Sequence, residues 1–273
     1  MGLQAAIAHV LVDDELRNEL VANPERIQRQ FSLTPEDMRL LLSSDPFALD
    51  RMSHRIRAKR LDLLEKGIPC TVRAVSRRIL AEFARATIPN IESEGGGRVL
   101  EEARRFVGYL RKLPDLQILP IYLPELAEFE LIRLELSSMT TVAVPPPEGG
   151  DDLCERSMVR LADQVRICKF RFDVIALTEP GRNEKDDAVT RDTVVVLNTK
   201  PIGGVVETYR IGEVVYEVLS LCSIPRRISD LYSSIAPVDA DAESHRVRLF
   251  KTVRLGLERG ILVREPSSCA FAP

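Results

Sequence analysis

Residues 203–235 read GGVVETYRIGEVVYEVLSLCSIPRRISDLYSSI and change from strand-like to helical patterning within one short stretch. Val205–Arg210 is rich in β-branched and aromatic residues, which is typical of a strand. Two segments with apolar residues at the spacing of one helix face follow it. These residues are Val214, Val218, Leu221 and Cys222, then Ile228, Leu231, Tyr232 and Ile235. Pro225 suits the first turn of the second segment. The stretch predicts one strand and two amphipathic helices.

The residues on either side extend this pattern. Upstream, Phe170–Leu177 and Asp192–Asn198 have the same strand-like composition, and charged or glycine-containing turns separate the three segments, which predicts a three-stranded meander. Downstream, Ala240–Arg259 predicts a third helix that ends at Gly260 in a left-handed cap. Its apolar side carries Val247, Phe250, Val253 and Leu257. One sheet face and three apolar helix stripes can close a single small core.

The first 140 residues are helical in pattern. Thr34–Asp37 combines a capping hydroxyl, a first-turn proline and two acidic residues, Asp45–Pro46 begins the next helix in a similar way, and Gly67 ends it. Two further apolar stripes consist of Val72, Val75, Ile79 and Phe83, and of Leu100, Ala103, Phe106, Val107 and Leu110. We expect five to seven helices here.

The break between the two halves is predicted at residues 144–152, where PPPEGGDD has the proline, glycine and charge content of a solvated linker. The fold class is therefore predicted to be α+β. An all-helical domain covers residues 1–143, and a small domain with a three-stranded antiparallel sheet and three helices covers residues 153–273.

Bulk composition favours a cytoplasmic protein. Net charge is −3, from 38 basic and 41 acidic residues, so no positive field marks the whole chain for nucleic acid. The five cysteines include no CxxC pair, which suits a reducing compartment. The N-terminus lacks the basic start of a signal peptide, and no apolar run approaches the roughly 20 residues that span a bilayer.

Catalytic and metal-binding patterns are weak. His9, His54 and His245 are dispersed, without HxxxH or HxE spacing, so we expect no metal site and no cofactor in this chain. The sequence has no GxSxG, Walker-type or GxGxxG motif. Paired acidic residues such as Asp13–Asp14 are expected to be solvated. The chain is therefore expected not to be an enzyme.

The run from 203 to 235 resembles the PqqD-like peptide-recognition domains of ribosomal peptide biosynthesis, which have a winged-helix-type fold. Val205, Val206, Tyr209, Val215, Leu219 and Ile228–Leu231 occupy comparable places. The resemblance implies that a precursor peptide adds as a strand beside the third strand and lies against the third helix. The implied contact residues are Val205, Val206, Glu207, Thr208, Tyr209, Arg246, Arg248, Leu249, Lys251 and Thr252.

Two more segments resemble the partner subunits of multinuclear non-heme iron-dependent oxidases, as in 3-thiaglutamate and methanobactin biosynthesis. VRICKFRFDVIAL lies at 165–177, and in YLPELAEFELIRLEL, at 122–136, Tyr122, Leu123, Ala127 and Glu130 fit a "yLxxlAxxE" helix. The resemblance implies that the chain pairs with such an oxidase, through Tyr122, Leu123 and Glu130. Iron then belongs to the oxidase, which modifies the bound peptide, at a cysteine.

The alternative is a winged-helix DNA-binding regulator. The third helix carries Arg246, Arg248, Lys251, Arg254 and Arg259, and RMSHRIRAKR at 51–60 is also basic. A winged-helix reader has a hairpin after its recognition helix, however, whereas here Ile261–Val263 make at most one short strand. Amphipathic helices also expose Arg and Lys to solvent as a matter of course. We therefore favour peptide binding over nucleic acid.

Overall fold

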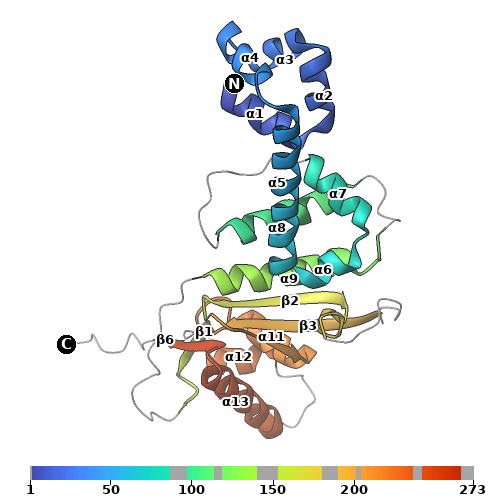
Figure 1. Cartoon of the computed structure of the whole chain (residues 1–273). Coiled ribbons are helices and arrows are strands. Elements are labelled where there is room, and N and C mark those ends of the chain that lie inside the picture. The colour runs from blue at the N-terminus through green and yellow to red at the C-terminus, as the bar shows by residue number, and fades with distance from the viewer. Residues whose placement is uncertain are drawn as a thin grey trace, which may run out of the picture. The chain divides into compact units, whose positions relative to one another are not determined.

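The computed structural model describes residues 2–86, 97–113, 119–139, 153–179, 190–200, 204–235 and 242–265. The fold is mixed α+β, as predicted, with a helical N-terminal region followed by a region of two small three-stranded antiparallel sheets and helices (Figure 1). The chain divides into two compact units, Met1–Leu134 and Glu135–Pro273. The predicted linker, 144–152, lies outside the described residues.

The first unit is helical throughout its described residues. Its helices are α1 (Leu3–Val12), α2 (Asp14–Ala22), α3 (Pro24–Phe31), α4 (Pro35–Leu42), α5 (Pro46–Gly67), α6 (Pro69–Ala74), α7 (Arg77–Ala86), α8 (Gly97–Leu110) and α9 (Leu123–Ser138), the last of which crosses into the second unit. The number of helices exceeds the five to seven expected. The reason is that single capping residues such as Asp13 and Asn23 separate short helices of only eight to ten residues.

The predicted helix signals are confirmed around α4 and α5. Thr34 and Asp37 form a capping box, the Asp45 carboxylate accepts a hydrogen bond from Phe47 N, and α5 ends at Gly67. The stripe that contains Val72 and Phe83 is buried as expected, but it is divided between α6 and α7 because Val75 is extended.

Helix α5 connects two hydrophobic cores within the first unit. Helices α1–α4 surround one core, against which Leu49 of α5 packs, and Leu64 of α5 belongs to the core of α6–α9. Between them, buried Arg60 donates from Nε to Glu102 at 2.7 Å, and its guanidinium lies 4.6 Å from the Phe83 ring centroid. The ion pair with Glu102 compensates the positive charge of this buried arginine.

The predicted meander forms the larger sheet of the second unit, in the order β2-β3-β4. Strands β3 (Thr190–Thr199) and β4 (Val206–Ile211) confirm two of the predicted segments. The first was placed too late, because β2 covers Val165–Phe172 and the short helix α10 covers Val174–Leu177. The Asp173 carboxylate accepts a hydrogen bond from Ala176 N and so caps a helical turn where a strand was expected.

The three C-terminal helices are also confirmed, as α11 (Glu213–Leu221), α12 (Ile228–Ile235) and α13 (Ala242–Glu258). Gly260 adopts the predicted left-handed conformation, with φ of 66°. The prediction for Pro225 was wrong, because Pro225 precedes the two-residue strand β5 (Arg226–Arg227) rather than entering the first turn of α12.

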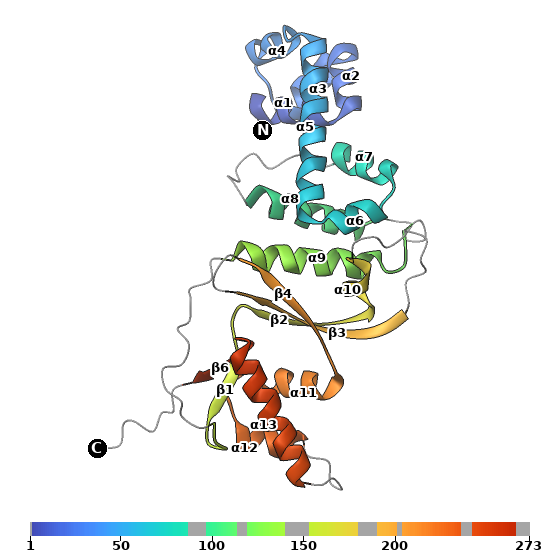
Figure 2. The ribbon, with the colours of Figure 1, turned by 60° about the horizontal axis from the view of Figure 1, so that its bottom comes forward.

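A second sheet, in the order β5-β1-β6, was not predicted. Figure 2 labels two of its strands, β1 and β6. Strand β1 (Met158–Leu161) pairs antiparallel with β6 (Leu262–Glu265), about a hundred residues later in the sequence, and with β5. Only β6 was anticipated, as one short strand at Ile261–Val263, because strands of two to four residues carry too little pattern to be recognised reliably. Val159 and Leu262 nevertheless join α11–α13 and the larger sheet in one core, as predicted for this region.

Among the described residues, no helix combines the length and apolar content that crossing a membrane requires.

Candidate functional site

Strand β4 forms one edge of the larger sheet, and no other described strand pairs with its outer side. Lys200 N donates to Val205 O at 3.0 Å, which makes these two residues a hydrogen-bonded pair. Since such pairs alternate in an antiparallel ladder, the backbone groups of Glu207, Tyr209 and Ile211 also turn toward β3. The backbone N–H and C=O groups of Val206, Thr208 and Arg210 therefore turn outward, away from β3.

The inward-bonded residues of β4 place their side chains on the core side of the sheet. Tyr209 and Ile211 pack against the core of the second unit. Tyr209 donates its hydroxyl hydrogen bond to Glu207, which also pairs with Lys200. The hydrogen bonds from Lys200 and Tyr209 lower the pKa of Glu207, whereas burial, then the Glu207 carboxylate, raises the pKa of Tyr209. Glu207 is thus held as a carboxylate within its own sheet.

The C-terminal end of α13 is fastened to this sheet. Asn198 of β3 donates from Nδ2 to the Arg259 carbonyl at 2.8 Å, and the Arg259 guanidinium lies 4.7 Å from the Tyr209 ring centroid. Helical spacing puts Arg248, Thr252 and Leu255 on the same side of α13 as Arg259. Arg259 directly follows α13, which ends at Glu258, and we call these four residues the β4-side face of α13.

The predicted peptide contacts on α13 separate into three groups. Arg248 is exposed and Thr252 half-buried on the β4-side face, about three and two helical turns before Arg259, which contacts Tyr209. Leu249 is only 7% exposed and belongs to the core, so it cannot contact a peptide directly. Arg246 and Lys251 line a groove on the other side of α13, where Arg246 forms an ion pair with Glu155 at 2.9 Å.

Two of the three residues predicted to contact an oxidase have internal roles. Leu123 is fully buried in the core of α6–α9. Glu130 is buried, and its carboxylate accepts hydrogen bonds from Cys70 N at 3.0 Å and Thr71 N at 2.7 Å, at the start of α6. Tyr122 is half-buried. At Leu123 and Glu130, the "yLxxlAxxE" pattern of residues 122–136 therefore serves packing within the helical unit and the capping of α6.

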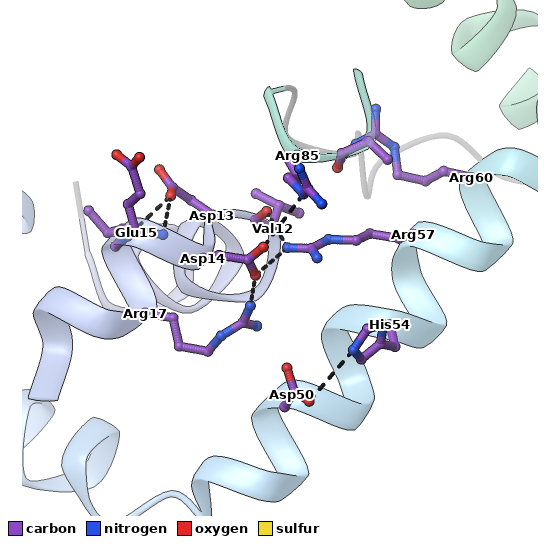
Figure 3. A network of polar contacts seen from close by, with 12 residues as sticks. Val12, Asp13, Asp14, Glu15, Arg17, Asp50, His54, Arg57, Arg60 and Arg85 are labelled. Atoms are coloured by element: carbon purple, nitrogen blue, oxygen red, sulfur yellow. Dashed lines mark hydrogen bonds and ion pairs between the residues drawn. The ribbon is translucent and has the colours of Figure 1, made fainter. Parts of the chain in front are cut away.

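The helical unit also contains a charge cluster that the sequence did not reveal. Asp13, expected to be solvated, caps α2 by accepting hydrogen bonds from Glu15 N and Leu16 N. Asp14 lies between three arginines, as Figure 3 shows. They are Arg17 and Arg57, which donate to Oδ1, and Arg85, whose Nε lies 3.6 Å from Oδ2.

Arg57 also donates to the Val12 carbonyl at 3.0 Å, so the cluster joins the α1–α2 junction to α5 and α7. Burial of Asp14 opposes its ionisation, but hydrogen bonding and the charges of Arg57, Arg17 and Arg85 outweigh it, and the pKa of Asp14 is lowered. Sequence spacing gives no sign of this cluster because its partners are up to about seventy residues apart.

The three histidines lie apart from one another in the structure. His9 packs against Phe31 with ring centroids 5.1 Å apart, His54 lies 3.6 Å from Asp50 on the exposed side of α5, and His245 is in α13. Throughout the described ranges, no three His, Cys, Asp or Glu side chains meet as metal ligands.

No protein-family model and no curated protein sequence matches this chain. Its role is therefore inferred from the edge of β4, the adjoining face of α13 and the sequence resemblance.

Proposed function

We propose that the second unit captures an extended ribosomal precursor peptide as an additional strand beside β4, and that the chain presents this peptide to a separate multinuclear non-heme iron oxidase. The supporting observation is the row of outward backbone groups at Val206, Thr208 and Arg210. The β4-side face of α13 reaches this strand at Arg259, whose guanidinium lies over the Tyr209 ring. An exposed strand edge is a template for another extended chain.

Backbone pairing would supply more binding free energy than charge. Two groups from each of three outward residues offer six hydrogen-bonding positions, and each bond formed contributes about 0.5–1.5 kcal/mol net. An exposed ion pair to Arg248 contributes only about 0.2–1 kcal/mol. The basic side chains of α13 would therefore favour an acidic peptide mainly by guiding its approach and setting its register.

In this proposal the chain is an accessory subunit and not the catalyst. Iron belongs to the oxidase, which modifies the captured peptide at a cysteine. This part rests on the resemblance of 122–136 and 165–177 to oxidase partner subunits. Because Leu123 and Glu130 have internal roles, an oxidase would contact other, exposed positions of the chain.

DNA binding is the second candidate, since Arg248, Lys251 and Arg254 are exposed on α13 and have no acidic partner in the described part of the chain. The strand that follows α13 argues against it. β6 pairs with β1, far upstream, so within the described residues α13 is not followed by a hairpin that could serve as a wing.

The test is fluorescence anisotropy with the short peptide that, on this proposal, is encoded beside the gene together with the oxidase. We expect saturable binding of that peptide, and only weak binding of duplex DNA that falls steeply as salt is raised. Sequence-selective binding of duplex DNA at physiological salt, without peptide binding, would reverse the ranking of the two functions.

A further inference from the structure

On the side of α13 opposite its β4-side face, an open groove of about 920 Å³ runs between the helix and the segment 153–156. Val247, Phe250, Lys251 and Arg254 of α13 line one wall, at the i, i+3, i+4 and i+7 positions that share one side of a helix. We call this the α13 groove.

The floor of the groove is apolar and partly open. Phe250 and Leu153 pack against the core of the second unit while lining the groove, and Val247 is 59% exposed. A half-exposed valine next to a phenylalanine offers a place for an apolar side chain of a partner.

The rim of the groove is positively charged. It carries four basic side chains and two acidic ones, and both acidic residues, Glu155 and Glu243, lie beside Arg246, at 2.9 and 3.9 Å. Lys251, Arg254 and Arg156 have no acidic partner among the described residues, which leaves uncompensated positive charge around an apolar floor. The groove is thus complementary to a segment that carries carboxylates together with an apolar side chain.

We propose that the α13 groove binds a second, acidic segment of the same peptide whose first segment adds to β4. This inference rests on the proposed function. The two surfaces lie on opposite sides of one helix, whose diameter is about 10 Å, and an extended chain covers about 3.3 Å per residue. Half the circumference of such a cylinder is about 16 Å, so at least about five residues would carry the peptide around α13 from one surface to the other.

Cys154 provides a reporter within the groove. Its exposed thiol Sγ lies 3.5 Å from Ser157 Oγ, and the Arg264 guanidinium donates to the same oxygen at 3.0 Å. The hydrogen bond from Ser157, followed by the backbone N–H of Arg156, lowers the pKa of the Cys154 thiol. A larger thiolate fraction makes Cys154 reactive toward iodoacetamide, so a bound peptide would slow its alkylation measurably.

The experiment uses a synthetic fluorescein-labelled peptide that alternates glutamate and leucine, and a lysine–leucine peptide for comparison. We expect saturable binding of the glutamate peptide by the full chain, and slower alkylation of Cys154 when mass spectrometry resolves each cysteine. Arg254→Glu should weaken this binding about five- to tenfold, because an attraction becomes a repulsion. Arg55→Glu, the same change at an exposed position of α5, should leave the affinity unaltered.

Any one of four results would overturn the groove proposal. They are absence of saturable binding, equal affinity for the lysine peptide, equal affinity of the Arg254→Glu and Arg55→Glu variants for the glutamate peptide, and an unchanged Cys154 alkylation rate at saturation. The proposed function fails separately, if the encoded precursor peptide does not bind the wild-type chain at all. Binding of the precursor that is indifferent to Arg254→Glu would leave strand addition standing and remove only the groove.

Discussion

At the scale of single residues, Asp14 is the acidic side chain that pairs with the arginines of the helical unit's charge cluster. The side chains of Arg17 and Arg57 are only 13% and 15% exposed, so removing the Asp14 charge would leave two largely buried guanidinium groups uncompensated. Asp14 itself is 42% exposed, and solvent screening reduces the loss below that of a fully buried pair. We expect Asp14→Asn to lower the free energy of unfolding by about 1–3 kcal/mol.

The effect should depend on pH in a defined direction. Because the pKa of Asp14 is lowered below its ordinary 3.8 in the folded chain, its stabilisation is present at neutral pH and is lost as pH falls through the lowered value. Urea unfolding followed by circular dichroism should therefore separate wild type from Asp14→Asn near pH 7 and bring them together in strong acid. Asp50→Asn, which removes only an exposed contact with His54, should change little. Equal unfolding curves for wild type and Asp14→Asn at pH 7 would refute this role.

The sequence predicted where a residue lies in the fold better than it predicted which contacts the side chain makes. Val205–Tyr209 was expected to lie at a sheet edge, and β4 is an edge strand. The acidic residues Asp14 and Glu130 could not be interpreted in the same way, because their partners are brought to them by the folding of distant helices. Leu249 was included among contact residues although its side chain faces the core.

At the scale of elements, the register of β4 distinguishes two neighbouring positions. The N–H of Val206 turns outward, so Val206→Pro would remove a donor offered to the peptide and keep the bonds to β3. The N–H of Glu207 turns toward Asn198, so Glu207→Pro would break the ladder. We expect Val206→Pro to weaken peptide binding at least about tenfold without loss of stability, and Glu207→Pro to cost about 1–3 kcal/mol of stability.

Titration calorimetry with the precursor peptide and thermal unfolding of each variant provide the two readouts. Size-exclusion chromatography with the oxidase serves as the control, since association with the oxidase is expected to survive Val206→Pro. If Val206→Pro keeps wild-type peptide affinity while remaining folded, the peptide docks somewhere other than the edge of β4.

Elements with long, regular patterns were predictable, and short ones were not. The three C-terminal helices and strands β3 and β4 follow periodicity that a window of residues displays. The shift of the first strand to Val165–Phe172 depends on one cap at Asp173, and β1, β5 and β6 are too short to show a period. Their pairing is decided by the closing of the core, which only the folded chain reveals.

At the scale of the whole molecule, the predicted α+β class is confirmed, and the structure places the candidate edge and α13 in one compact unit. If a peptide adds to β4 as proposed, one unit that contains both the strand and the helix would hold it without a contribution from the helical unit. On the proposed function, the helical unit is then available to bind the oxidase. Substitutions in one unit at a time should therefore separate peptide binding from association with the oxidase.

Amide hydrogen exchange of the full chain, resolved by residue with NMR, tests strand addition most directly. The account predicts that the amides of Glu207, Tyr209 and Ile211 are already protected in the free chain, since they bond to β3. Saturating precursor peptide should then protect the amides of Val206, Thr208 and Arg210 and leave exchange in α1–α8 unchanged. Saturated peptide binding with no new protection at these three amides would contradict strand addition to β4.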